Sequence, residues 1–131
     1  MIEFFVPGAP APQGSKRHVG RGILIESSKA VGPWRERVAL AAHAHTERLL
    51  TGPVGVRLHF VLPRPKSARN GVEITIKRPD VDKLARACLD AITDVVIHDD
   101  AQVVDLHATK RLALTDLPGV HIEIREWEWE E

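Results

Sequence analysis

The sequence predicts one α+β domain with a mixed β-sheet and two main helices. Several short segments alternate apolar with polar residues, which is the period of a half-buried strand. Two longer segments repeat apolar residues every three or four positions, which is the period of an amphipathic helix. The chain has 131 residues and no internal repeat, so we expect a single domain over residues 1–131.

The first half of the chain contains one predicted helix between short strands. Residues 2–6 are apolar and β-prone and predict the first strand. Residues 7–22 carry four glycines and three prolines and predict a mobile basic loop, followed by a short strand at 23–25. Apolar residues recur at helical spacing over about 33–49, with His45 on the apolar face, and predict the first helix.

The second half contains the other helix and the remaining strands. Residues 54–62 alternate in the manner of a half-buried strand, and a second basic loop follows. Residues 74–76 in that loop are β-prone and predict a short strand. A helix is expected over about 81–93, with Cys88 on its apolar face. Two further strands are expected, around 104–108 and 120–124.

Several classes of protein are excluded by simple counts. The sequence has no run of 18 apolar residues, so no transmembrane helix is expected. Its first residues lack the basic segment of a secretory signal, and we expect a cytoplasmic protein. Cys88 is the single cysteine, which excludes an internal disulfide and a zinc site built on several cysteines.

Charge is distributed unevenly, although the formal net charge is zero. Residues 1–86 hold 15 Lys or Arg against 7 Asp or Glu, and residues 87–131 hold 3 against 11. Such a basic part indicates a polyanionic partner, although a solvated basic surface is the simpler interpretation. Because the cations gather in two Gly/Pro-rich loops, we expect them to bind DNA phosphates. These residues are Lys16, Arg17, Arg21, Arg64, Lys66, Arg69, Lys77 and Arg78.

Three carboxylates, Asp80, Asp82 and Asp100, form the candidate active site. The first two flank the start of the second predicted helix, and Asp100 lies on a turn before the next strand. Short carboxylate side chains are ligands that Mg²⁺ prefers, and such an ion activates water and neutralises charge on a phosphodiester. Lys83 and Arg86 lie close in sequence and suit a phosphate group. This combination indicates a metal-dependent nuclease.

Each acid also has a purely structural interpretation. Asp80 is a good N-cap, Asp82 suits the positive end of the helix dipole, and Asp99 and Asp100 can form a turn. On that interpretation the protein is a DNA-binding module without catalysis, or a protein–protein adaptor with an acidic tail. Cleavage of DNA after addition of Mg²⁺ separates the nuclease from both alternatives.

The stretch 79–92, together with 99–105 and Lys110, resembles the RusA family of Holliday junction resolvases, of the phage and prophage type. The specific part is the Asp-x-Asp motif at 80–82, the predicted helix after it, and the Asp-Asp-x-Gln motif at 99–102. The resemblance extends more weakly to the N-terminal strand, the basic loop and the first helix. It implies a RusA-like fold.

The resemblance also implies a function. Family members are small homodimeric endonucleases that cut four-way DNA junctions with Mg²⁺, and the activity serves DNA recombination and repair. Asp80, Asp82 and Asp100 are then the metal ligands, and Asp99 is a less critical neighbour. Lys110 is expected to contact DNA with the basic loops. A dimer also follows from geometry, because symmetric cuts in a four-way junction need two active sites related by a two-fold axis.

Two positions depart from the family pattern. The functional lysine of the family is Arg86 in this chain, and the usual asparagine after the second motif aspartate is Lys83. A guanidinium does not release a proton near neutral pH, so we expect Arg86 to stabilise phosphate charge. Lys83 lies one turn earlier on nearly the same face and supplies an ammonium group.

Overall fold

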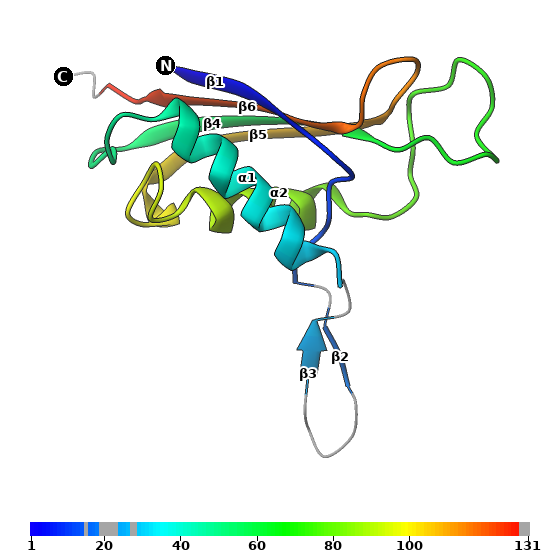
Figure 1. Cartoon of the computed structure of the whole chain (residues 1–131), viewed down its shortest axis with the longest axis horizontal. Coiled ribbons are helices and arrows are strands. Elements are labelled where there is room, and N and C mark those ends of the chain that lie inside the picture. Colours follow the sequence, from blue (N-terminus) through cyan, green and yellow to red (C-terminus); the bar gives the residue numbers. More distant parts are fainter. Residues whose placement is uncertain (15, 19–23, 27–28, 129–131) are drawn as a thin grey trace.

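A computed structural model describes residues 1–14, 16–18, 24–26 and 29–128, with side chains omitted for 16–18 and 24–26. Two helices and a short 3₁₀ turn lie among six strands (Figure 1). In chain order the elements are β1 (Ile2–Pro7), β2 (Lys16–His18), β3 (Leu24–Glu26), α1 (Val31–His45), β4 (Val54–Leu62), α2 (Val81–Ile92), η1 (Asp100–Gln102), β5 (Val103–Leu112) and β6 (Gly119–Glu126).

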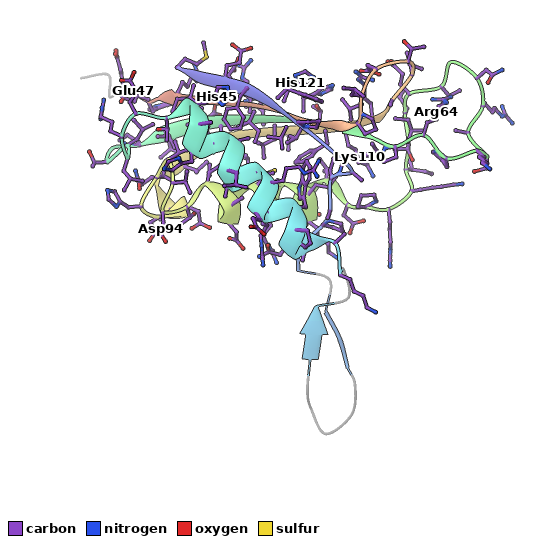
Figure 2. All side chains as sticks on the ribbon, viewed as in Figure 1. His45, Glu47, Arg64, Asp94, Lys110 and His121 are labelled. Carbon is purple, nitrogen blue, oxygen red and sulfur yellow. The ribbon has the colours of Figure 1, made fainter. Side chains whose placement is uncertain are left out.

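The main sheet has four strands in the order β1-β6-β4-β5. β4 pairs parallel with β5 and antiparallel with β6, and β6 pairs antiparallel with β1. Both helices lie on one side of this sheet (Figure 1). His121 lies on the other side (Figure 2). The predicted α+β class with a mixed sheet and two main helices is therefore confirmed.

β4 is the interior strand on which the core is built. It spans Val54–Leu62, as predicted, and has a neighbouring strand along each edge. Phe60 is fully buried beneath the helices, whereas Arg57 points to the open face and is exposed. The expected half-buried alternation holds only in the middle of the strand. Val61 is buried although its position alternates with that of Phe60.

α2 confirms the amphipathic helix expected from the sequence. It runs from Val81 to Ile92 and buries Leu84 and Cys88 against the sheet. Burial raises the pKa of the Cys88 thiol to about 12, so this cysteine stays protonated and belongs to the core.

α1 is shorter than predicted, because it ends at His45 rather than near residue 49. Thr46 has an extended backbone, and the amide of Leu50 donates to the carbonyl of Val96 at 2.7 Å. The chain after His45 is thus held by a distant segment, which local helical spacing cannot reveal. His45 was expected on the apolar face, but it is exposed and stacks on Phe4.

The predicted strand at 74–76 is wrong. Ile74 and Ile76 are 83% and 97% exposed and pair with no strand in the part of the chain that the structure describes. The whole segment 63–80 is a loop instead, and it is held by Arg64, whose guanidinium donates to the carbonyls of Val72 and Ala113. β-branched residues form strands only where a partner strand or a core is available.

The first basic loop also differs from expectation. Within 7–22 the backbone of β2 forms a two-stranded antiparallel sheet with β3, where a loop had been predicted. β3 begins at Leu24, close to the short strand expected at 23–25. In Figure 1 this pair projects away from the sheet, on the side of the helices.

Gly119 provides a test of the β1–β6 packing. A Cβ atom at Gly119 would lie 2.2 Å from the carbonyl oxygen of Val6 and 2.5 Å from Cζ of Phe5. We expect Gly119→Ala to lower the free energy of unfolding by about 2–3 kcal/mol in urea titrations. Gly52→Ala is the matched control, because no atom lies within 4 Å of a Cβ there. Equal stability of the two variants would contradict this packing.

Candidate functional site

The start of α2 carries two of the three candidate acids. Asp80 is the N-cap residue and has an extended backbone, but within the described chain its side chain makes no capping hydrogen bond. Its carboxylate lies 3.6 Å from Nζ of Lys83. Asp82 lies in the first helical turn and is exposed. Among the described residues, the Asp80 carboxylate is therefore not used to cap the helix, and the Asp82 side chain is open to solvent.

A lysine from β5 holds the turn in front of Asp80. Nζ of Lys110 donates to the carbonyls of Lys77, at 2.8 Å, and Pro79, at 3.0 Å. Lys110 and Arg64 lie at the same end of the molecule (Figure 2). The predicted DNA contact of Lys110 stays a prediction. The bonds seen here show a second role, which is to fix the backbone from which Asp80 projects.

The third acid, Asp100, begins the 3₁₀ turn before β5. Its neighbour Asp99 caps this turn by accepting from the amide of Ala101 at 2.8 Å. Gln102 accepts from the amide of Asp99 and donates to the carbonyls of Leu50 and Gly52. Asp99 thus stabilises the turn, whereas Asp100 stays exposed.

A hollow of about 360 Å³ lies between α2 and β5. Asp82, Arg86 and Asp100 line it, over a floor that includes Leu89 and Leu106. Asp80 does not line this hollow. It lines a neighbouring hollow of about 320 Å³ together with Lys83. The structure therefore brings Asp82, Arg86 and Asp100 to one surface depression and places the Asp80–Lys83 pair beside it.

Asp80 and Asp100 lie toward opposite ends of β5. Lys110, near the end of this strand, holds the turn before Asp80, whereas Asp100 precedes the first strand residue, Val103. Seven strand residues span about 23 Å. The yellow segment before β5 and the green loop before α2 accordingly lie at opposite ends of the sheet in Figure 1.

This separation bears on the expected metal site. Carboxylate oxygens are suitable donors for Mg²⁺. In the part of the chain that the structure describes, however, no three His, Cys, Asp or Glu side chains lie close enough together to hold a metal ion. The oxygen donors suit a divalent metal, and two of the three acids, Asp82 and Asp100, line one hollow.

The sequence analysis did not single out Gln13, which precedes β2. Its side chain forms hydrogen bonds to residues on both helices. Its side-chain amide donates to the carboxylate of Asp90 on α2, and its side-chain oxygen accepts from Arg35 on α1 at 2.6 Å. Its backbone amide donates to the carbonyl of Lys83 at 3.0 Å. These partners are 22 to 77 residues away in sequence, so no local pattern could have revealed the contact.

The expected DNA-binding residues fall into three groups. Those with exposed side chains are Lys66, Arg69, Lys77 and Arg78. Arg64 is half-buried, and its guanidinium is bound to backbone carbonyls of its own loop and of Ala113. Lys16 and Arg17 are described only as backbone of β2, and Arg21 lies outside the described residues.

A larger hollow of about 630 Å³ lies on the open face of the sheet, away from the three acids. His59, His107 and His121 line it. Burial and the nearby Arg111 lower the pKa of His59, so this ring is neutral at neutral pH. A neutral imidazole at His59 attracts phosphate weakly, and none of the three acids lines this hollow, so the α2–β5 side remains the candidate site.

No helix in the described ranges is long and apolar enough to cross a membrane.

Comparison with known proteins agrees with this arrangement. The sequence model of the family described as "Endodeoxyribonuclease RusA" matches residues 7–125. The chain is also 33% identical over 138 residues to "Uncharacterized protein YqaN" of Bacillus subtilis (strain 168), covering 95% of this chain and 96% of that protein. The match spans the helix start with Asp80 and Asp82, the turn with Asp100 and the hollow between α2 and β5. The chain therefore belongs to the RusA family of endodeoxyribonucleases, nucleases that resolve Holliday junctions and generally depend on a divalent metal ion.

Proposed function

We propose that this protein is a Mg²⁺-dependent, structure-selective endonuclease of the cytoplasm. It acts as a homodimer and resolves four-way DNA junctions by phosphodiester hydrolysis during recombination and repair. The observation that carries this proposal is the hollow shared by Asp82, Arg86 and Asp100, with the Asp80–Lys83 pair beside it. Acidic oxygens for a metal ion lie next to cations for a phosphate.

The chain's own residues have distinct roles in this proposal. Asp80, Asp82 and Asp100 would hold the ion, which when bound supplies an activated water and neutralises charge on the phosphodiester. Arg86 lies in the hollow with two of these acids and stabilises negative charge on the scissile phosphate. Lys83 sits one turn earlier and balances Asp80 in the absence of DNA.

The exposed cations of the loop 63–80 support binding of a DNA backbone near the same helix. Lys77 and Arg78 directly precede Asp80, and the carbonyls of Lys77 and Pro79 are fixed by Lys110. A strand that crosses this loop therefore passes the start of α2. Phosphate contacts of this kind provide affinity and position the DNA, while the acids perform the chemistry.

A synthetic four-way junction with one labelled strand tests the proposal. The purified chain should bind the junction in EDTA and release nicked and resolved products after Mg²⁺ is added. A linear duplex of the same sequence is the control and should stay uncut. Firm junction binding without any cleavage in Mg²⁺ would instead favour the DNA-binding module without catalysis.

The three acids should be required for cleavage and not for binding. We expect Asp80→Asn, Asp82→Asn and Asp100→Asn each to lower the single-turnover cleavage rate by at least about 10²-fold, because each loses a charged metal ligand. Junction affinity in EDTA should stay within about threefold, since the cations are intact.

Asp94→Asn is the matched control for these variants. Asp94 is exposed, lies outside both hollows and has a positive φ of 68°, which asparagine tolerates well. It should cleave at the wild-type rate. An acid-site variant that cleaves as fast as Asp94→Asn removes its residue from the site.

Arg86 and Lys83 should respond differently to substitution. Because Arg86 lines the hollow with Asp82 and Asp100, Arg86→Ala should slow cleavage by about 10²- to 10³-fold. Lys83→Arg should keep most activity if the cation acts only through its charge. Single-turnover rates at saturating Mg²⁺ decide this. An inactive Lys83→Arg beside an active Arg86→Ala would move the catalytic cation to Lys83.

Lys110 should behave as a positioning residue as well as a DNA contact. Lys110→Met removes both bonds to the carbonyls before Asp80, so the cleavage rate at saturating DNA should fall by about tenfold or more. Lys110→Arg keeps donors and should recover part of the rate. Lys66→Met is the control, since Lys66 is an exposed cation of the same loop and does not line the hollow with Asp80. A Lys110→Met variant that loses only affinity, as expected for Lys66→Met, would assign Lys110 to DNA contact alone.

A further inference from the structure

We propose that Gln13 and Gly14 are positioning residues for Arg86. They belong to the segment 10–14, which is bound to both helices and lies against the guanidinium of Arg86. The segment thereby holds this cation where it serves the hollow between α2 and β5. The inference rests on the proposed nuclease function and names two residues that act on the reaction through Arg86.

The first support is the close approach of the Gly14 backbone to Arg86. A Cβ atom at Gly14 would lie 2.5 Å from a terminal guanidinium nitrogen of Arg86 and 3.3 Å from its Cζ. The first distance is shorter than van der Waals contact allows. Gly14 also has a φ of +92°, in the region that favours glycine. The backbone conformation and the place of the guanidinium therefore both call for glycine at this position.

The second support is the set of hydrogen bonds that fixes this segment. The side-chain amide of Gln13 donates to the carboxylate of Asp90 on α2, and Arg35 on α1 donates to its side-chain oxygen at 2.6 Å. The backbone amide of Gln13 donates to the carbonyl of Lys83 at 3.0 Å. Ala11 of the same segment is buried in the core. A segment held in this way is a fixed wall against which the guanidinium lies.

Arg86 needs such a wall because its side chain is exposed. A free arginine side chain has many conformations, and ordering it on a phosphate costs conformational entropy. Arg86 lines the hollow with Asp82 and Asp100, and the Gly14 backbone excludes conformations on one side of its guanidinium. The cation is therefore oriented before DNA binds, which favours the transition state over a merely flexible charge.

The segment also borders the neighbouring hollow. Pro10 and Pro12 line that hollow together with Asp80 and Lys83. Proline fixes its own φ, so these two residues add stiffness to the wall. One rigid segment thus contacts both parts of the proposed site.

Gly14→Ala tests whether the contact positions Arg86. The methyl group displaces the guanidinium, so single-turnover cleavage at saturating junction and Mg²⁺ should slow by about 10- to 10²-fold. Junction affinity in EDTA should stay within about threefold. Gly71→Ala is the matched control and should cleave near the wild-type rate, because Gly71 has a φ of +78° and no atom lies within 4 Å of a Cβ there. An equal loss of rate in both variants would overturn the inference.

Double variants separate the positioning of Arg86 from a general effect on the fold. In an Arg86→Ala background no guanidinium remains, so Gly14→Ala should slow cleavage by less than about twofold more. In an Arg86→Lys background it should cost less than about threefold, since lysine lacks the branched nitrogens that the methyl group would meet. A cost of about tenfold or more in both backgrounds would assign Gly14 a structural role alone.

Gln13→Ala supplies a readout that does not depend on cleavage. It removes the side-chain bonds to both helices, so the segment should no longer restrain Arg86. The ¹⁵N–¹H heteronuclear NOE of the Arg86 Nε–H group, assigned by its loss in Arg86→Lys, should be high in the wild-type chain and fall in Gln13→Ala. An equally low NOE in both proteins contradicts positioning. Failure of the wild-type chain to cut any junction would instead refute the proposed nuclease function, so the two failures are distinguishable.

Discussion

The parallel pairing of β4 with β5 is the constraint on which the rest of the structure depends. Parallel neighbours cannot be joined by a tight turn, so the chain must travel back along the sheet before β5 begins. The loop 63–80 and α2 form most of this crossover connection. α2 buries Leu84 and Cys88 against the sheet. The Asp-x-Asp motif therefore lies at the start of α2, and Asp100 lies on the turn that leads into β5.

Polar side chains then fix the loops that this crossover leaves exposed. Arg64 and Lys110 bind backbone carbonyls of the loop 63–80, and Gln102 binds the carbonyls of Leu50 and Gly52 beside the turn with Asp100. Buried or half-buried donors of this kind pair with backbone oxygens that would otherwise lack a partner. As a result, the turn before α2 and the 3₁₀ turn before β5 both present their acids from fixed backbone. Site geometry of this kind depends on supporting residues as much as on the acids themselves.

Much of this arrangement could be predicted from local sequence patterns. The strand at 54–62 and the apolar face of α2 follow from periodicity, because both bury residues against the core. The acids could be chosen because their spacing around the helix resembles a known family. The strand expected at 74–76 was wrong because β-propensity acts only where a neighbouring strand exists. The bonds of Gln13 and Lys110 join residues 22 to 77 positions apart, so only the folded chain reveals them.

The central claim is that the acids at the start of α2 and on the turn before β5 perform metal-dependent cleavage of branched DNA. The most direct measurement is the single-turnover cleavage rate of a labelled four-way junction in Mg²⁺ by the wild-type chain and by Asp100→Asn. The account predicts that the wild-type chain resolves the junction, and that Asp100→Asn binds the junction but cleaves it at least about 10²-fold more slowly. Cleavage at the same rate by both proteins would contradict the account.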